Sequence, residues 1–383
     1  MAAARALTIG LNMMWPTDPD RCVCLRDHLR WVGQLYARPL VNRSARMRNK
    51  QNDFPVGGVR VGERIIPVPA SISPEAQAML RAAVQDDGTP LNALYPIPAP
   101  NDRAAWRQLQ AAAEAHYVDA FSAATNKIST KIETRRLGIA TIHVAIPENL
   151  RLKDCVFIDL HGGGLVFGGG DACRESTRLQ ANRLGMICYG IDYRMPPDHP
   201  YPAALDDCMT VYRHLVDQYG ADRILIGGRS AGGNLALASI LRARDEGLPF
   251  PAGAVLLSPE LDLTESGDSF QTNRTVDVVL PNPLMPNNLL YADGADLSHP
   301  YLSPLFGEMS AEFPPIFLQS GTRDLFLSNA VRLHRKLRRV GAPVELHVFE
   351  AMPHGGFSGS PEDMELAAEV ARFVTECLPS SVR

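Results

Sequence analysis

Short apolar runs alternate with helical patterns over the C-terminal two thirds of the chain. The apolar runs are rich in β-branched residues and end at turn residues, which is typical of buried strands. They cover residues 139–146, 155–160, 186–192, 223–226, 253–257, 316–319 and 344–349. Segments with a helical period lie between or after them, at 173–184, 203–219, 231–246, 328–340 and 361–377. This alternation predicts an α/β fold with a mostly parallel sheet flanked by helices.

The N-terminal third has a different pattern. Ser73-Pro74-Glu75 predicts a helix start, because it combines a capping hydroxyl, a first-turn proline and an acid near the positive helix end. Gly88 is the expected end of that helix. A second helix, rich in alanine and glutamine, is expected over 102–121. We therefore expect an N-terminal extension and helical cap over residues 1–135, and an α/β domain over residues 136–383.

One serine lies in the turn between a predicted strand and a predicted helix. The segment Gly228-Arg229-Ser230-Ala231-Gly232 follows the strand 223–226 and opens the helix 231–246. Small residues two positions on either side of Ser230 suit a tight turn that lifts its side chain out of the sheet. The helix N-terminus would support developing negative charge there. Because parallel sheets place their sites at the carboxyl ends of strands, Ser230 is a candidate nucleophile.

A serine hydroxyl needs a base, and the base needs an acid to orient it. Among the 10 histidines, His354 is the one in a glycine-flanked loop after a late predicted strand, 344–349. Asp324 follows the predicted strand 316–319 in the same way. The order Ser230, Asp324, His354 places each group after a different strand, so the sequence predicts a Ser-His-Asp triad.

A second glycine-rich loop follows the predicted strand 155–160. Its sequence is His161-Gly162-Gly163-Gly164. Glycines let backbone N–H groups approach a substrate closely, and such donors, together with the Ala231 N–H, would stabilise an oxyanion. A phosphate-binding role is not expected, because no Gly-Lys-Ser/Thr follows. His161 precedes the donors, so we interpret it as a residue that organises the loop.

Composition narrows the range of partners. The 383 residues carry a formal net charge of −4 without a long basic run, so no electrostatic reason favours nucleic acid. No run reaches the ~18 apolar residues that a membrane span needs, so no stable membrane insertion is expected. Cys22-Val-Cys24 has no matching second ligand pair, and no metal or other cofactor is expected.

The 7 cysteines are irregularly spaced, which does not support a disulfide framework. That favours a reducing compartment, and we expect a cytoplasmic protein. The alternative is export through the apolar stretch 6–15, which lacks a clear cleavage site.

Together these motifs resemble the hormone-sensitive-lipase-like family of the α/β-hydrolase superfamily, also called bacterial esterase family IV. The resemblance covers about residues 135–375. Five further segments support it, namely Asp192-Tyr193-Arg194, the run 197–207 with Asp206, Leu257-Ser258-Pro259, Asp262-Leu263-Thr264 and Tyr301-Leu302-Ser303-Pro304-Leu305.

The resemblance implies an α/β-hydrolase fold with a helical cap, and cofactor-free hydrolysis of short or medium acyl esters or small xenobiotic esters. It assigns Ser230, Asp324 and His354 to the triad, and the backbone N–H groups of Gly163, Gly164 and Ala231 to the oxyanion hole. Asp192, Arg194 and Asp206 would stabilise loops. The expected partner is a small-molecule ester. The helix 328–340 and strand 344–349 are candidates for a homodimer edge, with an ordinary solvent-facing edge as the alternative.

Two features depart from the family pattern. Arg229 stands beside the nucleophile, where the family most often has an acid, and this changes the charge behind the turn. Residues 1–66 are longer than the usual arm of the cap. Both features leave the substrate open, and the same triad would also serve a lactone or amide hydrolase. A hydrolase-like receptor without catalysis is a further alternative, which His354 disfavours.

Overall fold

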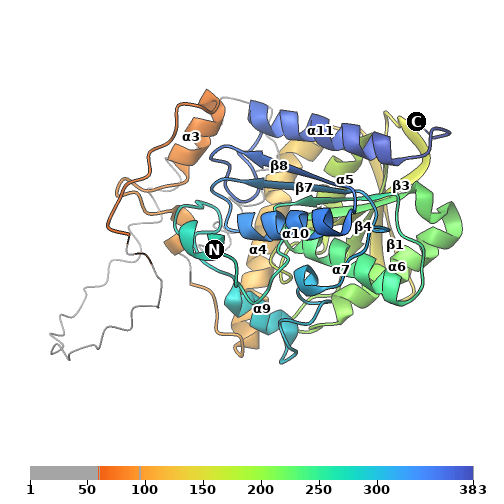
Figure 1. The fold of residues 1–383 in the computed structure, drawn as a ribbon, viewed down its shortest axis with the longest axis horizontal. Coiled ribbons are helices and arrows are strands. Elements are labelled where there is room, and N and C mark those ends of the chain that lie inside the picture. The colour runs from red at the N-terminus through yellow and green to blue at the C-terminus, as the bar shows by residue number, and fades with distance from the viewer. Residues whose placement is uncertain (1–58, 60, 95, 383) are drawn as a thin grey trace.

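The computed structural model describes residues 59, 61–94 and 96–382 (Figure 1). The apolar stretch 6–15 and the pair Cys22 and Cys24 lie outside these residues. The described part contains one eight-stranded sheet in the order β1-β2-β4-β3-β5-β6-β7-β8. Its strands are β1 Thr130–Leu137, β2 Ala140–Pro147, β3 Leu152–Leu160, β4 Met186–Asp192, β5 Ile224–Arg229, β6 Gly253–Leu257, β7 Ile316–Gly321 and β8 Val344–Phe349.

Most of the sheet is parallel, as the alternation of strands and helices predicts. The strands from β4 through β3, β5, β6 and β7 to β8 pair in parallel, whereas β2 pairs antiparallel with both β1 and β4. Strand β1 is absent from the sequence prediction. It lies at the sheet edge and most of its residues are exposed, so the segment Thr130–Leu137 carries little of the apolar pattern of a buried strand.

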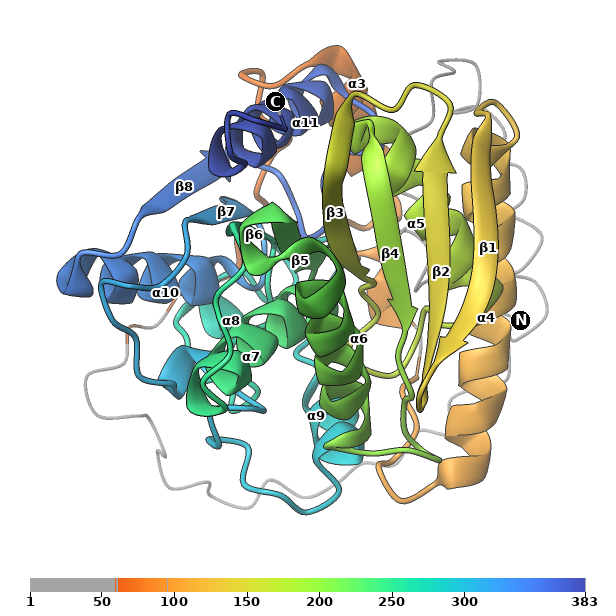
Figure 2. The same cartoon turned by 90° about the vertical axis from the view of Figure 1, so that its right-hand side faces the viewer.

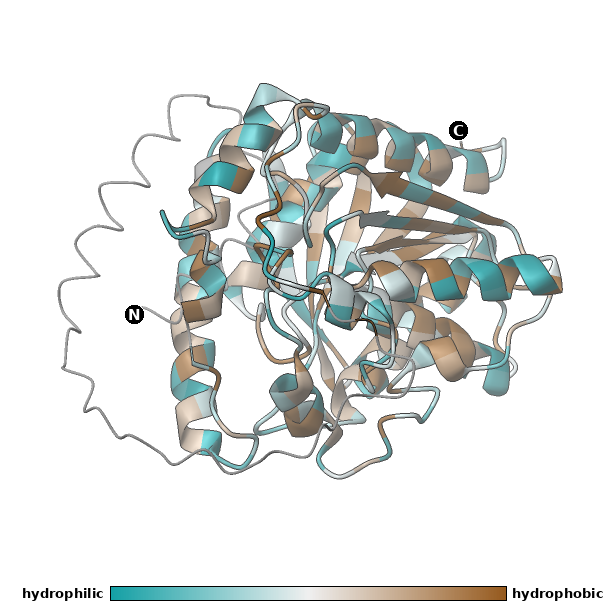
Figure 3. Cartoon of the chain, turned by 60° about the vertical axis from the view of Figure 1, so that its left-hand side comes forward, coloured by the Kyte–Doolittle hydropathy of each residue, from teal (hydrophilic) through white to brown (hydrophobic). Residues whose placement is uncertain are grey.

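Two layers of helices cover the sheet (Figure 2). On one face, apolar side chains of the strands pack against α6 Ala203–Tyr219, α7 Ala231–Asp245 and α10 Leu327–Val340. On the other face they pack against α5 Asp171–Leu184 and α11 Pro361–Cys377. The strands are mostly hydrophobic, whereas α10 and α11 alternate between hydrophobic and hydrophilic residues (Figure 3). This is the pattern of amphipathic helices on a buried sheet.

The helices of the α/β part begin and end within two residues of the predicted bounds. The sequence analysis does not predict five short elements. These are the helices α8 Ser269–Thr272 and α9 Met285–Ala292 and the 3₁₀ turns η2 Leu91–Leu94, η3 Ala221–Arg223 and η4 Pro304–Phe306. They are shorter than the window of about 11 residues over which a helical period can be recognised. Cys155 and Cys188 are buried core residues, as their apolar surroundings predict.

The N-terminal helices are α3 Pro74–Ala82 and α4 Arg103–Thr125. Ser73 caps α3 as predicted, but the helix ends six residues before Gly88, where a turn closes through a bridge between Val84 and Pro90. Helix α4 packs against α5 and buries Trp106 and Tyr117 in its own apolar cluster.

The sheet starts at Thr130, six residues before the predicted boundary of the α/β domain. The division into residues 1–135 and 136–383 stays a prediction. Within the part of the chain that the structure describes, no helix has the length and apolar character needed to cross a membrane.

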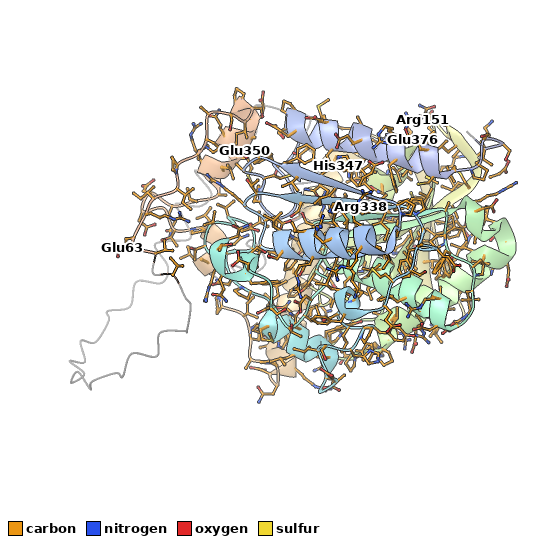
Figure 4. The ribbon with its side chains drawn as sticks, viewed as in Figure 1. Glu63, Arg151, Arg338, His347, Glu350 and Glu376 are labelled. Atoms are coloured by element: carbon orange, nitrogen blue, oxygen red, sulfur yellow. The ribbon has the colours of Figure 1, made fainter. Side chains whose placement is uncertain are left out.

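Strand β8 forms the outer edge of the sheet beside β7. Figure 4 labels Arg338 on α10 and His347 on β8, the two elements predicted as a homodimer edge. Both ring nitrogens of His347 face acids, Glu345 at 3.0 Å and Glu369 at 2.8 Å. Val348 is 42% exposed on the same strand. The homodimer stays a prediction.

Candidate active site

Ser230 lies between β5 and α7 with φ 56° and ψ −121°. A positive φ is unfavourable for a residue with a Cβ, so the turn holds Ser230 in a strained conformation. The backbone fixes it on both sides: its N–H donates to the Leu257 carbonyl at 2.9 Å, and its carbonyl accepts from the Glu260 N–H at 3.2 Å. The side chain is therefore presented at the carboxyl end of the sheet by a rigid turn.

Gly228 and Gly232 fit against the end of the neighbouring strand β3. A Cβ at Gly228 would lie 2.2 Å from the Leu160 carbonyl oxygen, and a Cβ at Gly232 would lie 1.9 Å from the same atom. Both distances are far inside van der Waals contact. The glycines predicted from the turn alone are thus also required by the strand beside it.

His354 and Asp324 are joined by a hydrogen bond. The Nδ1 atom of His354 lies 3.1 Å from Oδ1 of Asp324, and both side chains are buried. Asp324 also accepts from the Ser320 hydroxyl at 2.7 Å and from the Phe326 N–H at 2.9 Å. Burial alone would raise the pKa of Asp324, but hydrogen bonds from His354 and Ser320 hold it below its ordinary value. Asp324 is therefore an ionised acceptor that can orient the imidazole.

The glycine loop after β3 turns sharply beside Ser230. Gly163 has φ 125°, and a Cβ there would lie 2.2 Å from the Phe167 carbonyl oxygen. Its own carbonyl accepts from the Val166 and Phe167 N–H groups at 3.1 and 2.9 Å. Gly164 has φ 57°. Gly163 needs the absence of a side chain for this approach, and the glycines leave backbone rather than side chains at the surface of the site.

The structure brings the predicted site residues together. Ser230, His354, Gly163 and Gly164 line one cavity. Ala231 follows Ser230 directly as the first residue of α7. Asp324 lies behind His354, on the side of the ring away from the free Nε2 atom. The remaining walls of the cavity are mainly apolar, with Leu109, Tyr117, Phe167, Val279, Leu280 and Leu284 among them.

His161 organises the loop, as predicted. Its Nδ1 lies 2.9 Å from the Gly162 carbonyl, and its ring stacks on Tyr193 at a centroid distance of 3.9 Å. The Tyr193 hydroxyl donates to the His161 carbonyl at 2.8 Å. One ring nitrogen of His161, the Cys173 sulfur and a carboxylate oxygen of Asp192 lie within 4.8 Å of one another. Among the residues that the structure describes, these three side chains form a cluster that could hold a metal ion.

The residues assigned to loop support make specific contacts. Asp192 accepts from the Gly170 N–H at 2.9 Å and so ties the end of the glycine loop to β4. Asp206 pairs with Arg242 at 2.6 Å. Arg194 pairs with Asp207 instead, a fully buried carboxylate 2.9 Å from its Nη2. The sequence analysis names Asp206 for loop support but not Asp207, the adjacent acid that binds Arg194.

Sequence reasoning missed Asp277, which is fully buried and bonded to the loops that carry Asp324 and His354. Its Oδ2 accepts from the backbone N–H groups of Leu325 at 2.8 Å and His354 at 3.1 Å. Its Oδ1 accepts from Val279 at 2.9 Å and Leu280 at 3.0 Å, in the wall of the cavity. Burial and the nearby Asp324 raise the pKa of Asp277 to about 6. No motif surrounds Asp277, so only the tertiary structure reveals it.

Comparison with known proteins places the chain in a family. A profile of the family described as the alpha/beta hydrolase fold matches residues 157–358, more than half of the chain. An acetyl-hydrolase from Streptomyces hygroscopicus is 32% identical over 197 residues, which are 51% of this chain and 66% of that protein.

Solved structures agree over a longer stretch. The crystal structure of an esterase, E25, superposes with a TM-score of 0.77 at 31% identity and covers 84% of this chain and 100% of the other. An esterase from the bacterial hormone-sensitive lipase family superposes with a TM-score of 0.67 at 28% identity, over 80% of this chain and 99% of the other. The chain therefore belongs to the α/β-hydrolase family, within its hormone-sensitive-lipase-like branch.

Proposed function

We propose that this protein is a serine carboxylesterase that uses Ser230, His354 and Asp324. The observation that carries the proposal is the hydrogen bond between His354 and Asp324, with His354 lining the same cavity as the strained Ser230. The acetyl-hydrolase and esterase names of its relatives support an ester substrate. No cofactor takes part in the proposed reaction.

The reaction has two halves. Ser230 Oγ attacks the ester carbonyl carbon while His354 Nε2 accepts the hydroxyl proton, and Asp324 stabilises the imidazolium that forms. The carbonyl oxygen becomes an oxyanion, held by the N–H groups of Gly163, Gly164 and Ala231. Collapse of this tetrahedral intermediate breaks the bond to the alcohol, which takes the proton from His354 and leaves an acyl-enzyme. Water, deprotonated by His354, then releases the acid and restores Ser230.

The lining of the cavity supports the proposal that the acyl group of the substrate is short or medium in length. Its walls combine aliphatic and aromatic side chains with the glycine loop. Apolar walls bind an acyl chain through the hydrophobic effect, without demanding a particular polar partner at each position. Small xenobiotic esters fit the same description. Lactone or amide hydrolysis by the same three residues is the second candidate, because the triad acts on the carbonyl and not on the leaving group.

The test compares Ser230→Ala with the wild-type enzyme on p-nitrophenyl butyrate. We expect a loss of at least about 10³-fold in kcat, because the residual rate rests on binding and the oxyanion donors alone. Ser298→Ala, an exposed serine outside the cavity, is the matched control and keeps full activity. A fluorophosphonate should label the wild-type protein and Ser298→Ala but not Ser230→Ala. Equal turnover by Ser230→Ala and wild type would overturn the proposal. A wild-type protein that neither hydrolyses the ester nor reacts with the fluorophosphonate would favour the alternative of a non-catalytic, hydrolase-like receptor.

A further inference from the structure

Arg229 lies on the wall of the cavity, next to the nucleophile in the chain. Of the described residues that line this cavity, it is the one with a permanent charge. The others are apolar side chains, glycines, asparagines, Tyr117, Ser230 and His354. A cation in such surroundings is expensive to bury unless something of opposite charge meets it.

The direction of the Arg229 side chain follows from its place on β5. Side chains alternate along a strand, so Arg229 leaves the sheet on the same face as Leu225, which packs toward α5 and α11. Its Nε and Nη1 atoms are buried and have no hydrogen-bond partner among the described residues. The residue as a whole is only partly buried, so part of it reaches accessible space.

Two acids lie near enough to act on Arg229, and both are already engaged. Asp363 accepts from the backbone N–H groups of Phe357, Gly359 and Ser360. Asp324 is bound to His354. Burial has the largest effect on the pKa of Arg229 and lowers it, against the opposing influence of Asp363 and Asp324. Long-range attraction therefore keeps the cation in place, while at least two of its N–H donors stay unused.

An unused guanidinium fork has a clear chemical complement. Its planar donors match the two oxygens of a carboxylate, and charge-assisted hydrogen bonds of this kind are roughly twice as strong as neutral ones. Arg229 and Ser230 line the same cavity, so a substrate bound there is placed to supply the complementary group.

We propose that Arg229 binds a carboxylate on the substrate, so that the preferred esters carry a second, ionised acid group. The proposal rests on the hydrolysis proposed above and names its substrate class. The carboxylate can sit on the acyl part, as in half-esters of short dicarboxylic acids, or on the alcohol part, as in esters of hydroxy acids. The chemistry that Arg229 recognises is the same in both.

The test measures kcat/KM for matched pairs of charged and neutral esters. Methyl hydrogen succinate, glutarate and adipate are compared with methyl butanoate, pentanoate and hexanoate, which places the charge at graded distances from the ester carbonyl. The butanoate ester of glycolate, compared with propyl butanoate, places it on the alcohol. These esters carry no chromogenic leaving group, so the release of methanol or acid is followed by NMR.

In the wild-type enzyme, at least one charged ester should exceed its neutral partner by about tenfold to a hundredfold, the range expected for one hydrogen-bonded ion pair. Arg229→Gln should reduce this ratio by the same factor, and Arg229→Lys should retain part of it. Arg213→Gln, which removes an exposed arginine paired with Glu246, should leave the ratio at the wild-type value. The ratio within each variant corrects for any general loss of activity.

Binding without turnover gives a second readout. Glutarate should raise the Tm of the wild-type protein and of Ser230→Ala, but not that of Arg229→Gln. If neutral esters are hydrolysed while no charged ester is preferred and glutarate has no effect, the assignment of Arg229 is wrong and the esterase proposal stands. If no ester is turned over but glutarate still binds through Arg229, the esterase proposal fails and the carboxylate site stands.

Discussion

The backbone N–H of His354 donates to Oδ2 of Asp277 at 3.1 Å. An acid outside the proposed triad thus holds the loop of the proposed base, while its other oxygen holds Val279 and Leu280 in the cavity wall. The two loops that must meet a substrate share one buried carboxylate. We infer that Asp277 is a positioning residue for His354.

Replacing Asp277 tests this role. Asp277→Ala leaves four backbone N–H groups without their acceptor, and we expect kcat for p-nitrophenyl butyrate to fall by about 10²-fold, more than KM rises through the loosened cavity wall. Asp277→Asn keeps one acceptor oxygen and should recover part of the loss. A rise in KM without a fall in kcat, or equal effects of the two substitutions, would contradict a positioning role.

A methyl group at Gly232 should be destructive. Its Cβ would meet the Leu160 carbonyl oxygen at 1.9 Å, and this atom belongs to the backbone of a central strand that cannot move aside. We expect Gly232→Ala to lower the free energy of unfolding by about 3 kcal/mol or more. Urea unfolding followed by circular dichroism measures it. Gly62→Ala, with nothing within 4 Å of the added methyl, is the control and should stay near the wild-type value.

Buried acids make the stability depend on pH. Burial is the main cause that raises the pKa of Glu260 to about 8, whereas the ordinary value is 4.5. Between these values the folded state holds a proton that the unfolded chain releases, so stability falls as pH rises from about 4.5 to about 8. Glu260→Gln removes this titration. Its Tm should decline less between pH 5 and pH 8 than the wild-type Tm, whereas parallel curves would show that Glu260 titrates normally.

Glu362 joins helix α11 to the start of helix α3. Its two carboxylate oxygens accept from the backbone N–H and the hydroxyl of Ser73, at 2.7 and 2.8 Å. We expect Glu362→Ala to loosen α3, so that limited proteolysis cuts between α3 and α4 faster than in wild type, by about tenfold for a loss of roughly 1.4 kcal/mol. Glu365→Ala, an exposed acid on the same helix, should be cut at the wild-type rate. Mass spectrometry locates the cuts.

The sequence predicts the parts of the site that depend on short segments. Ser230, Asp324 and His354 each follow a recognisable strand, and their order along the chain restricts which strand ends can meet. Gly163 and Gly228 are recognisable because their roles need the absence of a side chain. Five of the strands and helices even begin and end where the pattern places them, as β4 and α6 do.

What the sequence misses depends on contacts between distant segments. Asp277 matters through N–H groups at Leu325 and His354, dozens of residues away, and nothing beside it marks that role. Strand β1 is defined by its pairing with β2 and not by its own apolar pattern. Arg229 is visible in the sequence as an unusual neighbour of Ser230. Only packing shows that two of its nitrogens have no partner among the described residues.

The left-handed backbone of Ser230 has a consequence for engineering. Glycine adopts φ 56° without the steric strain of a Cβ, and where this relief exceeds its larger loss of backbone entropy, a chain with glycine at this position folds more stably than the natural one. A library of variants selected only for resistance to heat would therefore tend to discard the proposed nucleophile. Any programme that improves the robustness of this enzyme must screen turnover alongside melting, because at residue 230 the two pull in opposite directions.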